Sequence, residues 1–296
     1  MSRVTSPVTD RSYGLATVCR VWRMARSAVY RHLAPVPATP PRRRGPIGAM
    51  SDAALTAAIH DVLAASPFHG EGHRKVWARL RHTGTRTSLR RVLRLMREND
   101  LLAPGRVGSA RGPRAHDGTI IPETVDTMWG TDLTVTFTGE GQAAVFIAVD
   151  HCSAECIGIH AHARATRFEA LEPIHQGVRR HFGGFAAAVA RGLKLRHDHG
   201  SQYMSDHFQK EIAFLGMESS PAFVRAPEGN GCAERFIRTL KENLLWIRTF
   251  ETIEELRQAL LEFQTTYNTK WLIERHGFTT PIAFRQMQLQ PLAKAA

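Results

Sequence analysis

The fold class is decided by two neighbouring stretches, TMWGTDLTVTF (127–137) and QAAVFIAVD (142–150). Both are rich in Val, Ile, Thr and Phe and are separated by turn residues, which predicts two β-strands. AECIGIHAH (154–162) predicts a third strand and LKLRHD (193–198) a short fourth. Helical patterns alternate with strands downstream. We therefore expect an α/β domain, with a mixed sheet flanked by helices.

Helices are expected on both sides of the fourth strand. Their stretches are 165–182, with a kink near Pro173, 205–216, 230–247 and 252–267. Ser205 is expected to cap the second of these helices and Gly216 to end it. Residues 218–226 are expected to be extended. Together these elements predict a domain over residues 123–290.

The first 122 residues are expected to be helical, with two linkers. Residues 12–34 predict a small helix-turn-helix with a break near Met24 and Ser27 as an N-cap. The Pro-, Gly- and Arg-rich stretches 35–48 and 103–122 predict linkers. Between them, residues 51–102 predict helices at 52–65, at 73–84 and from Ser88 onward. The predicted boundaries are 1–48, 49–104, 105–122 (linker) and 123–290.

Positive charge is concentrated in the first part of the chain. Residues 1–120 hold 21 Lys and Arg against 7 Asp and Glu, an excess of 14, whereas residues 121–296 hold 18 and 20. Such a region suits a polyanion, because binding it releases condensed counterions. The helix after Ser88 carries an arginine face that a DNA major groove could accept. The candidate DNA contacts are Arg90, Arg91, Arg94 and Arg97, with Arg74 and Lys75 before them; a solvated charged face is the alternative.

Cysteine usage and hydropathy argue against a secreted or membrane protein. Four cysteines without an apolar leader do not indicate a disulfide framework. No stretch approaches the length of an apolar membrane span. Cys152 and Cys156 lie near His151, His160 and His162, which could suggest zinc. However, the alternating strand pattern favours buried cysteines over a zinc site. Without a leader or a membrane span, we expect a cytoplasmic protein.

Three carboxylates are the candidate catalytic residues. Asp132 lies inside a strand, where a charge is costly unless it faces water, a partner or a metal. Asp198 ends an apolar strand, and ligands gather at strand ends in α/β sheets. Glu234 begins a helix on which Arg238 and Lys241 share its face. Carboxylate oxygens suit Mg²⁺, and two such ions can assist phosphodiester cleavage. Asp150, at another strand end, is an alternative to Asp132.

These residues carry a family resemblance. The sequence resembles OrfB-type transposases of insertion-sequence family three, whose DDE core is shared with retroviral integrases. The matching motifs are WGTD (129–132), HDHGSQY (197–203), with 35 residues between Asp198 and Glu234, PEGNGCAE (227–234), Lys241, and a closing motif from Tyr267-Asn268 through Arg275-His276-Gly277 to Thr280-Pro281. Residues 69–104 resemble the helix-turn-helix that precedes the family's core. Arg235 and His199 depart from the family's usual residues without removing a ligand.

The resemblance implies a ribonuclease-H-like core preceded by helix-turn-helix units. It implies that Asp132, Asp198 and Glu234 hold two Mg²⁺ or Mn²⁺ ions and cut and join DNA. Arg238 and Lys241 would contact substrate DNA. The implied partners are element terminal inverted repeats, target DNA, a second copy of the chain and an upstream OrfA protein or fusion, in a bacterial, nucleoid-associated setting. A non-catalytic DNA-binding regulator and a general ribonuclease-H-like nuclease are the alternatives.

Overall fold

A computed structural model describes residues 4–34, 50–105, 120–222 and 227–290 of the chain. The chain divides into two compact units, Met1–Ala49 and Met50–Ala296. The linker predicted at 35–48 and most of the one predicted at 103–122 lie outside the described residues. In the described part of the chain, no helix is both long and apolar enough to cross a membrane.

A five-stranded mixed sheet forms the centre of the second unit. Its strands are β1 (Met128–Thr138), β2 (Gly141–Asp150), β3 (Cys156–His162), β4 (Lys194–His197) and β5 (Glu218–Pro221), in the order β3-β2-β1-β4-β5. β1, β2 and β3 pair antiparallel, whereas β4 pairs parallel to both β1 and β5. The four predicted strands are therefore confirmed. The stretch expected to be extended contains β5, and residues 223–226 within it lie outside the described residues.

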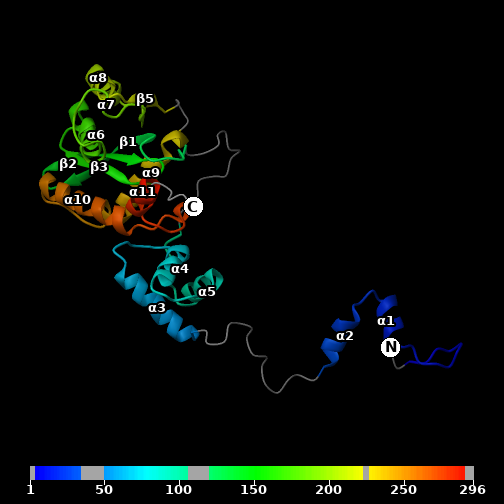
Figure 1. The fold of residues 1–296 in the computed structure, drawn as a ribbon. Coiled ribbons are helices and arrows are strands. Elements are labelled where there is room, and N and C mark those ends of the chain that lie inside the picture. The colour runs from blue at the N-terminus through cyan, green and yellow to red at the C-terminus, as the bar shows by residue number, and fades with distance from the viewer. Residues whose placement is uncertain (1–3, 35–49, 106–119, 223–226, 291–296) are drawn as a thin grey trace. The chain divides into compact units, whose positions relative to one another are not determined.

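Helices cover both faces of this sheet (Figure 1). One face carries α6 (Arg167–Phe182), α7 (Ser201–Met204) and α8 (Asp206–Phe214); the other carries α9 (Gly231–Leu240), the π-turn η2 (Lys241–Leu245) and α10 (Ile253–Lys270). β2 is buried from Ala143 to Asp150, and its successive side chains alternate between the two cores, as the strand period requires. α6 continues through Pro173. The predicted fold class, a mixed sheet flanked by helices, is confirmed.

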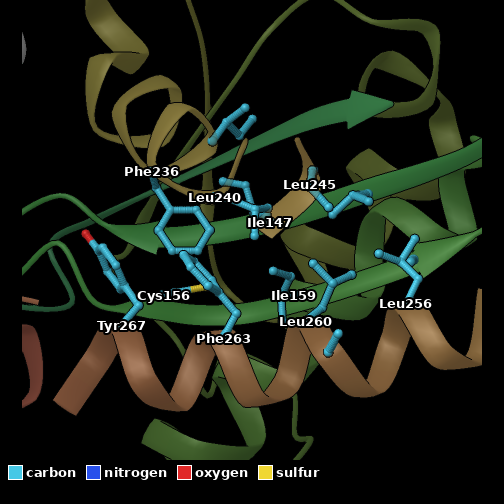
Figure 2. Packing of buried hydrophobic residues seen from close by; sticks show 14 of the residues in the cluster. Ile147, Cys156, Ile159, Phe236, Leu240, Leu245, Leu256, Leu260, Phe263 and Tyr267 are labelled. Atoms are coloured by element: carbon cyan, nitrogen blue, oxygen red, sulfur yellow. The ribbon is translucent and has the colours of Figure 1, made fainter. Parts of the chain in front are cut away.

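The core between the sheet and α10 is rich in aromatic rings (Figure 2). Phe236 of α9 lies edge-to-face with Phe263 and Tyr267 of α10, with ring centroids 6.1 and 4.8 Å apart. Ile147 and Ile159 meet these rings from the sheet. Each fully buried side chain of this size contributes roughly 1.5–3 kcal/mol by leaving water. This packing fixes α9 against the sheet.

Three helices form a separate small core before the sheet. They are α3 (Asp52–Ala65), α4 (His73–His82) and α5 (Leu89–Glu98), packed around Leu55, Val76 and Val92. Ser88 caps α5 by accepting from Arg91 N, as predicted. This bundle contacts the sheet domain: His69 N donates to Asn243 Oδ1 at 2.8 Å. The structure groups both parts in one compact unit, and the domain boundary near residue 104 stays a prediction.

The first unit contains α1 (Leu15–Val21) and α2 (Arg26–Leu33). The break between them is where the sequence predicts it, but the prediction of Ser27 as an N-cap is wrong. α2 begins at Arg26, two residues earlier than a Ser27 cap requires; the extended backbone of Ala25 occupies the cap position, so Ser27 already lies inside the helix. The end of α1 is open: Val21 is 72% exposed, and Trp22, which follows the helix, is 59% exposed.

Candidate active site

Asp132 lies in β1, and Asp198 directly follows the adjacent parallel strand β4. Gly130 of β1 is in register with Arg196 of β4. Asp132 is two residues beyond Gly130, and Asp198 is two residues beyond Arg196. Because the strands run parallel, the two carboxylates follow the same end of the pairing, where α/β sheets gather ligands.

Glu234 reaches this end of the sheet through α9. It lies in the first turn of α9, which begins directly after Asn230. The Asn230 side chain donates from Nδ2 to the Thr131 carbonyl of β1 at 3.1 Å. Glu234 is exposed, as is Arg238, which donates from Nε to Glu242 Oε1 at 2.8 Å. Lys241 is half-buried and begins the π-turn η2. Such turns are frequent at functional sites.

Electrostatics joins these groups into one site. The pKa of Asp132 is raised from 3.8 to about 6, chiefly by burial. The charges of Asp198 and Glu234 raise it further, whereas the backbone N–H of Leu133 and the charge of Lys241 lower it. Asp132 is therefore repelled by both Asp198 and Glu234, and Lys241 partly compensates that repulsion. Repulsion of this kind is what a bound cation relieves.

Backbone N–H groups orient two of the carboxylates. Asp132 Oδ1 accepts from Leu133 N and Asp198 Oδ1 from Gly200 N, both at 2.8 Å. Neither Oδ2 accepts a hydrogen bond from a residue that the structure describes. Among the described residues, no three His, Cys, Asp or Glu side chains form a ready metal-binding group. The three carboxylates are thus electrostatically coupled without forming a closed ligand set.

The raised pKa of Asp132 predicts a pH-dependent cost in stability. Below pH 3.8 both folded and unfolded chains hold the proton; between pH 3.8 and about 6 only the folded chain does; above about 6 the folded chain carries the full penalty. We expect Asp132→Asn to stabilise the metal-free protein by up to about 3 kcal/mol at pH 8 and hardly at all at pH 3.5. Urea unfolding at both pH values measures this. An equal gain at both values would contradict the prediction.

Asp150, the alternative to Asp132, is enclosed. Its side chain is fully buried. Oδ1 accepts from Ser153 N and Ser153 Oγ at 2.7 and 2.8 Å, and Oδ2 accepts from Asp126 N at 2.9 Å. These bonds shape the turn between β2 and β3. Asp150 therefore serves the structure of the turn, and both of its oxygens are occupied.

The closing motif holds the same turn. Asn268 of α10 accepts from Cys156 N and donates to Cys156 O, both at 2.9 Å. Arg275 donates from Nη2 to His151 O at 2.8 Å, and His276 Nε2 lies 3.0 Å from Cys152 O. Burial, together with the charge of Arg275, lowers the pKa of His276 to about 4, so its ring is neutral. The motif is a structural clasp around the turn after β2.

The four cysteines are free and buried thiols. Burial raises the pKa of Cys152 to about 11, so its thiol stays protonated at neutral pH. His160, one of the candidate zinc ligands near it, is instead paired with Glu169 at 2.6 Å. These contacts agree with the expectation that Cys152 and Cys156 are strand and turn residues of the core.

The candidate DNA contacts on α5 fall into two groups. Arg91 and Arg94 both pair with Asp52 at 2.7 Å, and Arg94 also pairs with Glu98. Hydrogen bonds from the two arginines lower the pKa of Asp52 to about 2. Arg90 and Arg97 are exposed and pair with no carboxylate that the structure describes. The arginine face is therefore partly occupied by internal ion pairs.

The two candidates on α4 contact the sheet domain. Arg74 pairs with Glu274 at 2.7 Å, with both side chains 57% exposed. The Lys75 ammonium lies 2.6 Å from the centre of the Trp271 ring. Their role as DNA contacts stays a prediction.

Several residues near the candidate site had no pattern in the sequence that predicted their contacts. Gly130, His151 and Asn230 meet beside Asp132, and Asp126 and Glu155 pair with Arg285 of α11 (Pro281–Leu289). Asn230 stands in the quoted PEGNGCAE stretch, but its partner Thr131 is 99 residues away. Tyr203 of the HDHGSQY stretch is fully buried and stacks on His197, so it serves the core.

Two protein families match parts of this chain. The "HTH-like domain" matches residues 51–107, which hold α3 to α5. The "Integrase core domain" matches residues 215–281, which hold α9, Glu234 and α10. Together with the sheet order, these matches confirm the predicted mixed sheet flanked by helices and the helix-turn-helix region before it.

Named relatives come from insertion elements of Escherichia coli. An uncharacterized 48.2 kDa protein of insertion element IS2A is 27% identical over 82% of this chain and 57% of its own length. Transposase InsD for insertion element IS2D (strain K12) is 28% identical over 80% of this chain and 79% of its own length.

Solved structures also resemble the chain. The catalytic core domain of BIV integrase is 19% identical over 55% of this chain and 95% of its own, with a TM-score of 0.42. The simian T-cell lymphotropic virus intasome is 18% identical over 82% of this chain and 76% of its own, with a TM-score of 0.47.

Proposed function

We propose, from the premise that this chain is a relative of the insertion-element transposases with an HTH-like domain and an integrase core domain, that it is a DNA transposase. It would cleave phosphodiesters at the ends of an element and join those ends to target DNA. The observation that carries the proposal is the coupling of Asp132 to Asp198 and Glu234. Asp132 inside β1 is repelled by two further carboxylates, and a bound cation would relieve that repulsion.

The donor set fits two Mg²⁺ or Mn²⁺ ions. All three side chains offer hard oxygen ligands, which these ions prefer. The raised pKa of Asp132 also fits a bound cation, because a cation would offset the carboxylate charges that help to raise it. Bound ions would activate the attacking oxygen and stabilise the leaving one. Asp132, Asp198 and Glu234 would hold them, with the backbone N–H groups of Leu133 and Gly200 orienting the two aspartates.

Two cations beside the carboxylates would contact the DNA. Lys241 acts on the charge of Asp132 already in the protein alone, and Arg238 is exposed on the same helix. Both would pair with phosphate oxygens near the scissile bond, and Lys241 would also keep Asp132 ionised. A transposase must hold two DNA ends at once, which favours a homo-oligomer. An OrfA protein is a further proposed partner.

Cleavage of element-end DNA tests the proposal. The full chain is incubated with duplexes carrying the element's terminal repeats and Mg²⁺, and nicked and joined products are resolved on a gel. A transposase gives both products. Binding without cleavage would instead favour a DNA-binding regulator. Cleavage of RNA–DNA hybrids without cleavage of element ends would favour a general nuclease.

The helix-turn-helix domain should bind DNA through those arginines that are not already paired. Each phosphate contact contributes about 0.9 to the slope of log affinity against log salt concentration. We expect Arg90→Ala combined with Arg97→Ala to make that negative slope shallower by about 2 and to weaken binding to all DNA sequences alike. Fluorescence anisotropy at several salt concentrations measures it. Arg91→Ala is the control, because its loss removes an ion pair with Asp52 and should leave the slope nearly unchanged. If Arg91→Ala changed the slope and the double variant did not, the exposed arginines of α5 would not be the DNA contacts.

A further inference from the structure

A side-chain amide joins the two backbone segments that carry Asp132 and Glu234. Asn230 directly precedes α9 and lies four residues before Glu234. Its Nδ2 donates to the carbonyl of Thr131, the residue directly before Asp132, at 3.1 Å. Asn230 is 6% exposed and Thr131 is fully buried. This hydrogen bond therefore links the strand of one carboxylate to the helix of the other, in a place that water does not reach.

The space around this amide is filled by a histidine ring. A Cβ added at Gly130 would lie 2.5 Å from His151 Nε2 and 2.6 Å from Asn230 Oδ1. Any side chain larger than glycine at position 130 would push these atoms away, because Cβ contacts under 3.0 Å do not occur in proteins. Gly130 thus allows Asn230 to approach β1. We call Gly130, His151 and Asn230 the latch.

The histidine of the latch is held from the other side. His151 is fully buried, and its Nδ1 lies 2.9 Å from the Ile120 carbonyl. Its own carbonyl accepts from Arg275 Nη2 at 2.8 Å. Moving the His151 ring would break its contact with the Ile120 carbonyl, and moving its backbone would break the bond to Arg275. The position of Asn230 is set by two neighbours, the Thr131 carbonyl and the His151 ring.

We propose that Asn230 is a positioning residue that sets the separation of Glu234 from Asp132 and thereby the affinity of the site for divalent ions. The inference rests on the proposed function, since it takes these carboxylates as the ligands. Asn230 itself would touch neither ion nor substrate. Residues that orient metal ligands in this way typically change metal affinity by 10–100-fold when they are lost.

Binding of Mn²⁺ to the full chain without DNA tests the proposal. Electron paramagnetic resonance measures free Mn²⁺ directly, so the readout does not depend on activity. We expect Asn230→Ala to weaken Mn²⁺ binding by about tenfold or more. Asn230→Asp should weaken it as well, because an ionised carboxylate cannot donate to the Thr131 carbonyl. Thermal unfolding of each variant confirms that the protein is folded at the assay temperature.

Asn243→Ala is the matched control. Asn243 is a second buried asparagine, 8% exposed, whose Nδ2 donates to Thr239 O at 2.9 Å and whose Oδ1 accepts from His69 N. Its loss costs a comparable amide in the same unit, but its hydrogen bonds reach only the last turn of α9 and His69, and neither Thr131 nor the first turn of α9 that carries Glu234. We expect it to lower the melting temperature while leaving Mn²⁺ affinity within about twofold of the wild type. An equal loss of Mn²⁺ affinity in both variants would overturn the positioning role.

Gly130→Ala tests the same contact from the opposite side. It should weaken Mn²⁺ binding, and adding Asn230→Ala should then cost less than it does in the wild type, because the clash with Oδ1 is gone. Fully independent effects would overturn the latch. Asp198→Asn separates the two proposals. If the wild type and Asn230→Ala bind Mn²⁺ equally well while Asp198→Asn does not bind it, only the latch fails. If the wild type binds no Mn²⁺, both proposals fail.

Discussion

Asp198→Asn should reduce cleavage of element-end DNA by about 10³-fold or more at saturating Mg²⁺, which corresponds to about 4 kcal/mol of lost transition-state stabilisation. The amide keeps the size of the side chain and can still accept from Gly200 N through Oδ1, so the turn after β4 should fold as before. What it removes is the negative charge that a divalent ion requires. Single-turnover cleavage, measured with protein in excess over DNA, reports the chemical step.

The control for this variant is Asp206→Asn. Asp206 is an exposed carboxylate in the first turn of α8, eight residues further along the chain. The same chemical change there should alter cleavage by less than about twofold, because surface substitutions away from special features have small effects. If Asp198→Asn cleaves within about threefold of the wild type, Asp198 is not a ligand, and the assignment of the site would have to be abandoned.

Local signals predicted the elements that carry the site. The Val, Ile, Thr and Phe content of β1 and β2 and the face shared by Glu234, Arg238 and Lys241 are properties of short windows of sequence. Ser205 caps α8 as predicted, because a cap needs only residues three positions apart. Ser27 shows the limit of this reasoning: α2 begins after Ala25, which offers no capping side chain, so a nearby serine does not fix where a helix starts.

Contacts between distant residues left no such signal. Asn230 meets Thr131 across 99 residues of sequence, and Arg285 meets Asp126 across 159. Likewise, the arginine stripe of α5 was visible in the sequence, but the pairing of Arg91 with Asp52 depends on how α3 packs against α5. Pairing of side chains is a property of the folded chain as a whole, so a single sequence shows which charges exist but not which are already neutralised.

One such long-range contact anchors the last helix. Arg285 of α11 is 4% exposed and donates two hydrogen bonds to Asp126, at 2.7 and 2.8 Å. It also forms an ion pair with Glu155, and Asp150 lies 3.9 Å away. Burial opposes the positive charge, but the three carboxylates more than offset it and raise the pKa of Arg285. One guanidinium therefore neutralises carboxylates that lie just before β1 and beside the β2–β3 turn.

Arg285→Ala should lower the free energy of unfolding by about 3–5 kcal/mol, because it leaves the buried Glu155 and the half-buried Asp126 without their cation. Urea unfolding at pH 7, followed by tryptophan fluorescence, measures the loss. Arg248→Ala is the matched control: Arg248 pairs with Glu255 at 3.0 Å, but its side chain is 47% exposed, so its loss should cost less than about 1 kcal/mol. The loss in Arg285→Ala should shrink as the pH falls, since burial already raises the pKa of Glu155 and protonation removes the unpaired charge. Equal costs for the two arginines would show that α11 is not anchored by this network.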